Sequence, residues 1–482
     1  MSEPAMPSQT YAMSIGGRDV AGVEHIEVIN PADGQVFATA PNCTPEQMDE
    51  AIAAARAAQP AWAALPFEER RARVVALAQI LSDNQDLLMH LLTREQGKPH
   101  AAATGEIMGA AHWFQSAADL ALPVEVLEDT DERRTETRRV PLGVVGAILP
   151  WNFPVLVFAF KVIPALLAGN TIVAKPSPYT PLTTLEVGRL FAKALPPGVL
   201  NVISGGDDLG RWVTEHPGID KIGFTGSTAT GKRIVRAAAD TMKRLTLELG
   251  GNDAAIVLPD VDVEAVAQAL FWGAFGNTGQ VCVAAKRVYV HADIYDAFAK
   301  AMIDYAATVT IGDGAQQGVQ LGPVQNRMQF DRVNSLIADS QALGHKVHSI
   351  GQVPDGDGYF VPVTIVDNPP DDARVVVEEA FGPVLPLLRF HAVDEVVARA
   401  NATDYGLAGS VWSADLDLAA TIAAHLQCGT VWINTIQDSP PATPIAGHKQ
   451  SGLGVENGAA GLLEYTNAQT VVLRKRPAAQ PA

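Results

Sequence analysis

The sequence predicts an α/β protein with doubly wound parallel sheets, and two observations lead to this prediction. From residue 140 onward, short apolar β-rich runs alternate with helical patterns, which is typical of parallel sheets joined by crossover helices. The alternation starts again after the glycine pair Gly250-Gly251, so a sheet-type core occurs twice. We therefore expect ligands to bind at the carboxyl ends of the strands.

The composition limits the kind of protein this is. The 482 residues are 48% hydrophobic and 18% charged, as in an ordinary soluble globular protein. The net charge of −18 argues against a nucleic-acid partner, which would need a basic surface. The three cysteines, Cys43, Cys282 and Cys428, are few and far apart, so we expect no disulfide framework, no metal site and a cytoplasmic location.

The ends and the most apolar region give no targeting signal. Residues 1–17 lack a basic segment followed by an apolar one, and we expect them and the polar residues 477–482 to be flexible termini. The apolar region 140–175 is interrupted by prolines, asparagines and a lysine. We therefore expect a buried core there and no membrane span.

The first part of the chain predicts helices. Thr44-Pro-Glu-Gln47 has a capping residue, a proline at the first helical position and a glutamine three residues after the cap. The helix that begins there is expected to end near Pro60. Further helices are predicted over residues 66–95 and 105–120.

The rest of the chain predicts the two sheets. In the first block, strands are expected at residues 144–149, 171–174, 200–203, 221–224 and 244–247, and helices at 158–167, 181–194, 208–215 and 230–240. In the second block, strands are expected at residues 255–258, 286–290, 384–390 and 406–412. Between the N-terminal helices and the first sheet lies the charged segment 127–139, which is either a solvated loop or exposed hairpin, or an arm that pairs with another subunit.

One stretch combines an apolar helical pattern with a flexible end. Residues 271–282 contain Gly273, Gly276 and Gly279, which allow tight turns and a close approach to a ligand. The stretch ends at Cys282. A thiol in this place is either a small core side chain or a nucleophile, and the stretch alone leaves both open.

Three strand ends in the first block carry polar residues. Asn152 is an amide held between Pro150 and Pro154, and it either satisfies turn backbone or donates to a ligand. Ser227 lies in a glycine-containing turn at the start of a helix, where backbone N–H groups can hold a pyrophosphate. Such a turn can also simply connect a strand to a helix without binding a ligand. Glu248 ends an apolar strand, where burial would raise its pKa, unless it pairs with a nearby cation. No Gly-x-Gly-x-x-Gly fingerprint follows any strand.

Taken together, these motifs resemble the aldehyde dehydrogenase superfamily from about residue 20 to 475. The motifs, in order, are Pro150-Trp-Asn-Phe-Pro154, Ala174-Lys-Pro-Ser177, Phe224-Thr-Gly-Ser-Thr228, Glu248-Leu-Gly-Gly251, Gly279-Gln-Val-Cys282, Glu379-Ala-Phe-Gly-Pro383 and Gly447-His-Lys-Gln-Ser-Gly-Leu-Gly454. The resemblance implies a cofactor domain over residues 18–122 and 141–250, a catalytic domain over 251–455, and an oligomerisation arm over 123–140 and 462–476.

The resemblance also implies an activity, the oxidation of an aldehyde to a carboxylic acid with NAD(P)+. Cys282 would attack the aldehyde carbon, and the Asn152 amide with the Cys282 backbone N–H would hold the oxyanion. Glu248 would activate the water that hydrolyses the thioester. The charged segment 127–139 and residues 470–473 would then be oligomerisation elements, so a homodimer or homotetramer is expected.

The remaining roles that the resemblance implies concern the cofactor and the substrate channel. The implied cofactor residues are Trp151, Lys175, Ser177, Gly206, Gly210, Phe224, Gly226, Ser227, Leu249, Glu379 and Phe381. The implied channel residues are Phe153, Val157, Phe160, Gly276, Val281, Val283, Ser439 and Ile445. Pro178 stands where NAD-preferring relatives often carry a glutamate, so we expect NAD with NADP as an open alternative. The channel has few rings and no arginine, which favours an uncharged aldehyde.

Three alternatives remain at this point. A coenzyme A-acylating semialdehyde dehydrogenase would typically lack the base at Glu248. A catalytically silent structural relative would lack Cys282, Asn152 or Glu248, and all three are present. A cysteine hydrolase would need a histidine base, and only His448 lies in any of the motifs.

Overall fold

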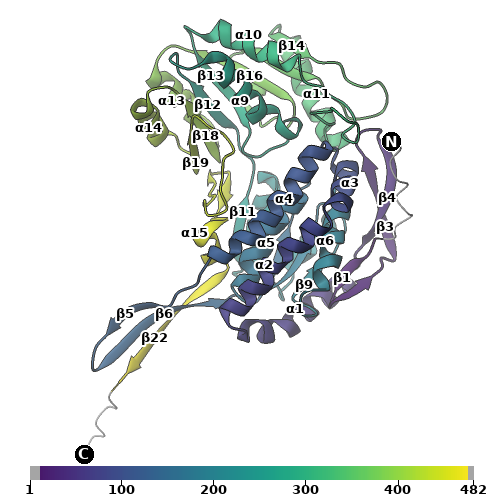
Figure 1. Cartoon of the computed structure of the whole chain (residues 1–482), viewed down its shortest axis with the longest axis vertical. Coiled ribbons are helices and arrows are strands. Elements are labelled where there is room, and N and C mark those ends of the chain that lie inside the picture. Colours follow the sequence, from purple (N-terminus) through teal and green to yellow (C-terminus); the bar gives the residue numbers. More distant parts are fainter. Residues whose placement is uncertain (1–10, 476–482) are drawn as a thin grey trace, which may run out of the picture.

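The computed structural model describes residues 11–475, which form two sheet-based lobes and a projecting three-stranded arm (Figure 1). The two parallel-strand sheets confirm the predicted α/β fold class. Among residues 11–475, no helix combines the length and the apolar character that crossing a membrane would require.

The first lobe is built on an eight-stranded sheet with the order β2-β1-β9-β8-β7-β10-β11-β21. Its strands are β1 (Met13–Ile15), β2 (Arg18–Val20), β7 (Val144–Ile148), β8 (Thr171–Lys175), β9 (Leu200–Val202), β10 (Lys221–Thr225), β11 (Arg244–Glu248) and β21 (Gly452–Leu453). The five strands from β9 to β11 are parallel, and β7 lies in the middle. The strand order therefore reverses beside β7, which is the position where ligands bind in such sheets.

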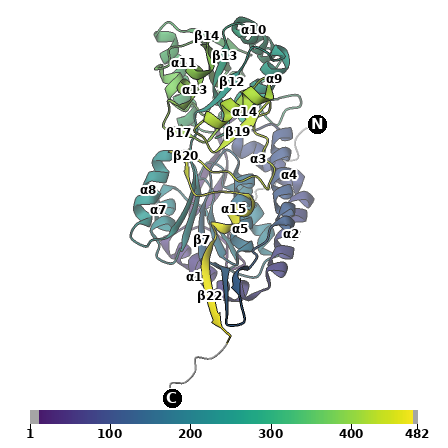
Figure 2. The same cartoon turned by 90° about the vertical axis from the view of Figure 1, so that its left-hand side faces the viewer.

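Helices cover both faces of this sheet. The helices of the first lobe are α1 (Pro45–Ala64), α2 (Phe67–Asp83), α3 (Gln85–Gln96), α4 (His100–Ser116), η1 (Ala117–Asp119), α5 (Pro154–Leu167), α6 (Leu182–Ala192), α7 (Asp207–Glu215) and α8 (Thr228–Ala238). Figure 2 shows α7 and α8 on one side of the strands and α2, α4 and α5 on the other. A two-stranded ribbon of β3 (Glu24–Asn30) and β4 (Gln35–Asn42) runs along the edge of this lobe (Figure 1).

The capping prediction at Thr44 is confirmed, and two helix boundaries were wrong. The Thr44 hydroxyl accepts from the Gln47 N–H at 3.3 Å, and the Gln47 side chain accepts from the Thr44 N–H at 3.1 Å. The helix continues through Pro60 to Ala64 because Trp62 anchors the last turn, donating its indole N–H to the Leu166 carbonyl at 3.0 Å. The predicted helix over residues 66–95 is two helices, α2 and α3, separated at Asn84.

The prediction of a flexible N-terminus was wrong for residues 11–17. These residues contain β1, whose three residues are buried and which pairs antiparallel with β2 and with β9. The Gly16 N–H also donates to the Asn201 side chain at 2.8 Å. Residues 1–10 and the predicted C-terminal tail 477–482 lie outside the described residues.

The second lobe is built on a seven-stranded sheet with the order β14-β15-β16-β13-β12-β18-β19. Its strands are β12 (Asp253–Val257), β13 (Ala285–His291), β14 (Lys346–Ile350), β15 (Val363–Asp367), β16 (Val384–Phe390), β18 (Ala408–Trp412) and β19 (Thr430–Ile433). Its helices are α9 (Val263–Phe275), η2 (Gly276–Gly279), α10 (Tyr295–Ala306), α11 (Arg327–Ala342), α12 (Arg374–Val377), α13 (Val393–Asn401) and α14 (Leu416–His425).

Both faces of this second sheet are buried. Ala255 and Val257 of β12 pack in the core formed with α9 and α10. Ala254 and Ile256, which point the other way, pack in the core formed with α11 and α14. This explains the continuous apolar runs by which the central strands could be predicted.

The predicted strand over residues 406–412 is interrupted. β17 (Tyr405–Gly406) pairs with β20 (His448–Lys449), whereas β18 joins the main sheet. Between them the Gly406 and Leu407 carbonyls both accept from the Gly429 N–H at 3.1 Å. The chain therefore changes partner at Leu407, near the junction of the two lobes.

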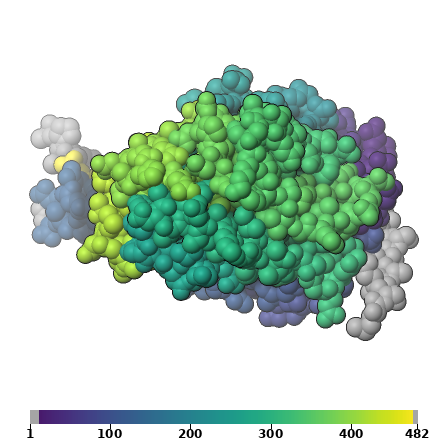
Figure 3. Space-filling model, turned by 90° about the horizontal axis from the view of Figure 1, so that it is seen from above, coloured from purple at the N-terminus to yellow at the C-terminus, as the bar shows by residue number. Residues whose placement is uncertain are grey.

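The charged segment forms an arm. β5 (Glu125–Asp129), β6 (Arg133–Pro141) and β22 (Thr466–Arg474) make a three-stranded antiparallel sheet that leaves the first lobe (Figure 1). Seen from above, β5 and β6 in blue and β22 in yellow project beyond the body (Figure 3). The short helix α15 (Gly458–Leu463) leads into β22. An irregular loop is therefore wrong, whereas β5 and β6 do form the exposed hairpin of the same alternative, with cross-strand ion pairs such as Arg134–Asp129 at 2.7 Å along the ladder. Pairing of the arm with another subunit stays a prediction.

Candidate active site

Predicted site residues gather at one edge of the first sheet. Asn152 follows β7, Ser177 follows β8, Ser227 follows β10, and Glu248 is the last residue of β11. Because these strands are parallel, their carboxyl ends lie along the same edge. The fold therefore brings together residues that are almost a hundred positions apart in the chain.

Asn152 is buried, and its amide faces the segment that carries Cys282. Its Nδ2 donates to the Gln280 carbonyl at 2.9 Å. An amide nitrogen has two hydrogens, so a second donor is left for another acceptor. The turn-satisfying role that the sequence left open does not describe this contact, because Gln280 belongs to the other lobe.

A buried ion pair holds Asn152 from behind. The Lys98 ammonium group lies 2.5 Å from Glu106 and donates to the Asn152 carbonyl at 2.9 Å. Glu106 in turn accepts from the Val155 and Leu156 N–H groups, at 2.8 and 3.2 Å, at the start of α5. The peptide that carries the amide is therefore fixed by charged groups that are excluded from water.

Cys282 lies on the connection between η2 and β13. The η2 segment before this connection is sharply turned, since Asn277, Thr278 and Gly279 all have positive φ values of 50°, 58° and 74°. A Cβ atom on Gly279 would overlap the Gly382 carbonyl oxygen, so only glycine fits. Of the three glycines predicted to allow tight turning, Gly279 does so, whereas Gly273 lies inside α9 and Gly276 has a φ of −50°.

Burial and neighbouring carboxylates disfavour the ionised form of the Cys282 thiol. Burial raises the pKa of Cys282 to about 12, and the negative charges of Asp253, Glu248 and Glu379 add to this effect. Lys286 acts in the opposite direction. No histidine contributes, which removes support for the cysteine hydrolase alternative.

Glu248 is buried, and its Oε1 has no hydrogen-bond partner within residues 11–475. Burial raises the pKa of Glu248 well above its usual range, and the nearby Glu456 adds to this effect. The alternative in which Glu248 pairs with a neighbouring cation is wrong. Lys243 donates to the Thr214 and His216 carbonyls, and Arg244 donates to Asn467. The carboxyl group is therefore uncommitted.

Glu379 connects the second lobe to the strand end of the first. Its Oε1 accepts from the Gly251 N–H at 3.1 Å and lies 3.2 Å from the Lys286 ammonium group. Phe381, two residues on, stacks edge to face with Trp151 at 5.3 Å between ring centres. Three of the predicted cofactor residues thus meet where the lobes face each other.

Lys175 and its neighbours form a second group at the sheet edge. Lys175 is buried beside Gly210 of α7, and burial lowers the pKa of its ammonium group to about 8. The Ser177 hydroxyl accepts from the Tyr179 N–H at 3.3 Å. Gly206 precedes α7, and a Cβ atom there would meet open space.

The turn after β10 presents a helix start. Ser227 is the N-cap of α8 and accepts from the Thr230 N–H at 3.3 Å. The Phe224 ring covers Gly226, and Leu249 packs against α8. The exposed start of an eleven-residue helix suits a pyrophosphate group.

Comparisons with known proteins agree with this geometry. The model of the aldehyde dehydrogenase family matches residues 18–471. A Pseudomonas protein named "Probable aldehyde dehydrogenase" is 44% identical, over 97% of this chain and 95% of that protein. The chain belongs to the aldehyde dehydrogenase family. It is an NAD(P)-dependent aldehyde dehydrogenase.

Two solved structures extend the comparison. The NAD+ complex of an aldehyde dehydrogenase from Bacillus cereus is 35% identical, with a TM-score of 0.94 and 97% of each chain covered. An NADP-dependent enzyme of E. coli is also 35% identical, with a TM-score of 0.94 and with 97% of this chain and 98% of that chain covered. Both cofactors therefore occur among structural relatives of this dehydrogenase.

The predicted channel residues of the dehydrogenase are dispersed around the Cys282 loop and α5. The Phe153 ring lies 4.0 Å from the Lys98 ammonium group, and Phe160 contacts Trp113 at 5.2 Å between ring centres. Val157 and Val281 are buried. The other predicted channel residues, Gly276, Val283, Ser439 and Ile445, are half-buried.

Two of these channel residues have defined contacts. The Val283 carbonyl accepts from the Gln437 side chain at 3.5 Å. Ile445 exchanges backbone hydrogen bonds with Glu456 at 2.7 and 2.8 Å. Ser439 makes no hydrogen bond to any other predicted channel residue within residues 11–475, so its place in the channel stays a prediction.

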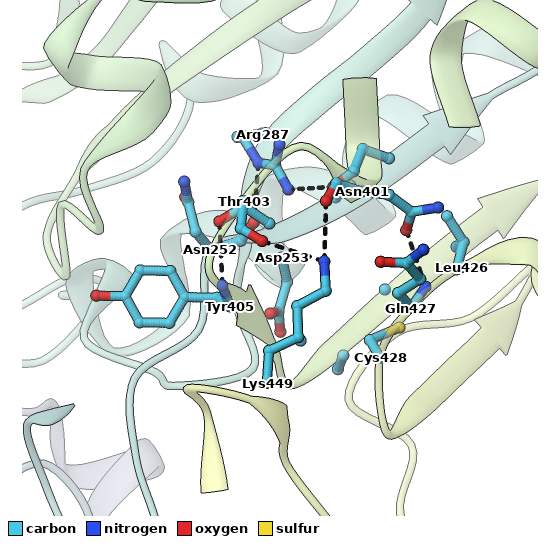
Figure 4. A pocket seen from close by; sticks show the side chains of 15 residues that line it. Asn252, Asp253, Arg287, Asn401, Thr403, Tyr405, Leu426, Gln427, Cys428 and Lys449 are labelled. Atoms are coloured by element: carbon cyan, nitrogen blue, oxygen red, sulfur yellow. Dashed lines mark hydrogen bonds between the residues drawn. The ribbon is translucent and has the colours of Figure 1, made fainter. Parts of the chain in front are cut away.

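A small pocket lies beside the site, lined by Asp253, Cys428 and Lys449 (Figure 4). Its volume is about 20 Å³, room for a single water molecule, so it is not the aldehyde channel. Asp253 is buried with Oδ2 unpartnered among the described residues, and burial raises its pKa to about 7. In residues 11–475 no His, Cys, Asp and Glu side chains form a group that could hold a metal ion.

Sequence reasoning missed the charged groups that support the site. Lys98 and Glu106, Lys161 and Glu456, and Lys286 are all buried, and each lysine is ion-paired. A signal existed for two of them, because Lys161 interrupts an apolar helical run and Lys286 begins an apolar strand run. Lysine is seldom fully buried unless it is paired, so each predicts an unseen carboxylate.

Proposed function

We propose that this dehydrogenase oxidises an aldehyde to the carboxylic acid through a thioester on Cys282, with Glu248 as the general base and Asn152 as an oxyanion donor. The observation that carries the proposal is the convergence of three groups between the lobes. The Asn152 amide contacts the Cys282 segment through the Gln280 carbonyl, and the uncommitted, buried Glu248 carboxyl group lies close enough to Cys282 to raise the pKa of its thiol.

The first half of the reaction needs a nucleophile and stabilisation of negative charge. The Cys282 thiolate attacks the aldehyde carbon, and the carbonyl oxygen becomes an oxyanion. The second N–H of the Asn152 amide and the Cys282 backbone N–H donate to it. The carbon then expels hydride with its electron pair, and the oxyanion collapses to the thioester carbonyl.

The second half needs a base. Glu248 takes a proton from water, and the resulting hydroxide attacks the thioester carbon. The carbon–sulfur bond breaks, so the carboxylic acid leaves and Cys282 regains its thiolate. The raised pKa of Glu248 suits this role, because a carboxylate that is costly to keep charged accepts a proton readily.

The residues present fit a nicotinamide dinucleotide, which when bound supplies the hydride acceptor. The free helix start at Ser227 suits the pyrophosphate, and the buried Lys175 has donors to spare because its one hydrogen bond within residues 11–475 goes to the Pro176 carbonyl. Glu379 and Phe381 lie on the Cys282 side, where we place the nicotinamide ribose. We propose that the other cofactor residues predicted from the sequence also contact the dinucleotide.

We expect NAD as the preferred cofactor, with NADP as the alternative. Pro178 cannot accept a hydrogen bond from a ribose 2′-hydroxyl, and it offers no positive charge to a 2′-phosphate. The small and aliphatic channel residues favour an uncharged aldehyde, because no arginine lies among them to grip a carboxylate.

The arm supports a homodimer or homotetramer, and the three free cysteines suit a cytoplasmic location. Val126, Leu127, Val472 and Leu473 are each about half exposed on its three strands, and such apolar groups favour cover by another subunit. The same proposal divides the chain into a cofactor domain over residues 18–122 and 141–250, a catalytic domain over 251–455, and an arm over 123–140 and 462–476.

Two alternatives, one an enzyme and one a protein without activity, are less well supported. A coenzyme A-acylating enzyme has no need of a base at Glu248, and a silent relative has no need of the nucleophile. Both residues are present, and Glu248 lies close enough to Cys282 to raise the pKa of its thiol, which supports this proposal. We therefore retain hydrolysis by water as the proposed fate of the thioester.

The test measures reduced nicotinamide formation with uncharged and carboxylated aldehydes, each with NAD and with NADP. Cys282→Ala is expected to abolish turnover with the fold intact by circular dichroism, and substantial remaining turnover would contradict the nucleophile assignment. Glu248→Gln is expected to give one equivalent of reduced cofactor in a burst and then stall. An undiminished steady state would show that another group acts as the base.

A further inference from the structure

Lys286 is a buried lysine in the site for which the reaction above has no role. It lies four residues after Cys282 at the start of β13 and is only 6% exposed. Its ammonium group donates to the Cys282 carbonyl and lies 3.2 Å from Glu379. A charge this well shielded from water interacts strongly with its neighbours.

The charges around the thiol are unbalanced without this lysine. Asp253, Glu248 and Glu379 each disfavour ionisation of Cys282, whereas Lys286 favours it. Among the described residues with the largest effects on the pKa of the thiol, Lys286 is the one cation. The thiolate needed for attack on an aldehyde therefore depends on Lys286 for its compensation.

Lys286 also has a geometric effect. By holding the Cys282 carbonyl, it fixes the plane of a peptide next to the nucleophile, a few residues after the three positive-φ residues of η2. Its second partner, Glu379, accepts from the Gly251 N–H. The contacts thus form a continuous connection from the Cys282 turn to the strand end that carries Glu248.

We propose that Lys286 is a positioning residue for aldehyde oxidation, whose ammonium group compensates the Cys282 thiolate and ties the nucleophile's peptide to Glu379. The proposal rests on the proposed role of Cys282 as the nucleophile. Lys286 takes no part in proton transfer in this proposal, and the thiol proton leaves to solvent.

The test measures the rate at which iodoacetamide alkylates Cys282 as a function of pH, without cofactor. Mass spectrometry assigns the alkylation to Cys282 and separates it from Cys43 and Cys428, which are also free thiols. Lys286→Gln keeps a donor for the Cys282 carbonyl and removes the charge. We expect its alkylation rate at pH 8 to fall at least about tenfold, the equivalent of one pKa unit.

Two companion variants separate charge from structure. Lys286→Arg keeps the charge and should retain most of the alkylation rate. Asp253→Asn removes an opposing carboxylate and should shift the alkylation profile to lower pH, the reverse of Lys286→Gln. Lys243→Met is the matched control, since Lys243 is similarly buried and also donates to backbone carbonyls, those of Thr214 and His216, but lies at the opposite end of β11 from Glu248, so its profile should equal the wild-type one.

The geometric part is tested by comparing Lys286→Met with Lys286→Gln. The methionine variant also loses the hydrogen bond to the Cys282 carbonyl, so its kcat should fall below that of the glutamine variant. Equal alkylation profiles for wild type and Lys286→Gln would overturn the proposal, and so would a loss in Lys286→Gln that Lys286→Arg shares in full. If Cys282→Ala retained turnover, the proposed function itself would fail, so the two failures are distinguishable.

Discussion

The buried pair Lys98–Glu106 allows a quantitative test of how the site is supported. We consider Glu106→Gln, which keeps the side-chain shape and an oxygen to accept from Val155 and Leu156. It removes the negative charge that lies 2.5 Å from the Lys98 ammonium group, and both side chains of this pair are at most 1% exposed. An unpaired buried charge of this kind costs about 3–5 kcal/mol.

The pKa of a free lysine sets an upper limit on the loss of stability in Glu106→Gln. Lys98 can give up its proton, so that no unpaired charge is left buried. From the ordinary value of 10.5, neutralisation at pH 7.5 costs roughly 4 kcal/mol, and at pH 9.5 about 1.4 kcal/mol. The folded variant binds fewer protons at Lys98 than the folded wild type, while the unfolded chains are alike there. The difference in the free energy of unfolding therefore falls as pH rises.

Urea unfolding at fixed protein concentration, at pH 7.5 and at pH 9.5, measures this difference. We expect a loss of about 3–4 kcal/mol at pH 7.5, which shrinks at pH 9.5. The double variant Lys98→Met/Glu106→Gln should recover much of the loss. As a control, Asp304→Asn breaks the exposed pair Lys300–Asp304 on α10 and should cost under about 0.5 kcal/mol. A loss below about 1 kcal/mol in Glu106→Gln, or one independent of pH, would refute the reasoning.

Three further predictions concern the cofactor edge, the nucleophile turn and the arm. Lys175→Met should weaken cofactor binding, measured by fluorescence titration, yet raise the free energy of unfolding of the cofactor-free protein, measured by urea unfolding. The cofactor affinity of the wild type should fall as pH rises through about 8, where Lys175 loses its charge. Gly279→Ala should lower kcat/KM by at least about tenfold and lower the free energy of unfolding by roughly 1–3 kcal/mol, because the φ of Gly279 is 74° and the Gly382 carbonyl occupies the position of a Cβ atom. Steady-state kinetics and thermal melting measure these two effects. Val472→Asp should shift the sedimentation coefficient to a smaller species, and an unchanged value would show that the arm does not join subunits.

The central strands and the candidate catalytic residues near the ends of strands and turns could be predicted from the sequence, because the patterns that indicate them are local. Glu248 ends an apolar run, Asn152 stands between two prolines, and Cys282 follows a glycine-rich turn. Each of these patterns lies within a dozen residues. The parallel order of the strands then places their ends at one edge.

What could not be predicted depends on distant partners. Lys161 and Glu456 are 295 residues apart and form a buried pair at 2.5 Å beside Glu248. β1 has only three residues, too few for a periodic pattern, and it is a strand because β2 and β9 pair with it. No local pattern contains such information, since it arises when the chain folds back on itself.

The closing strand β21 has a consequence for the order in which the protein is made. Glu248 and Leu247 pair with Gly452 and Leu453, which leave the ribosome only after the whole second lobe. Until then β11 is an open edge of the first sheet, and Lys161 lacks its carboxylate partner. Completion of the base's surroundings therefore comes late in biosynthesis, with only α15 and β22 of the described elements still to follow. A chain arrested before that point keeps an open strand edge, which is prone to aggregation.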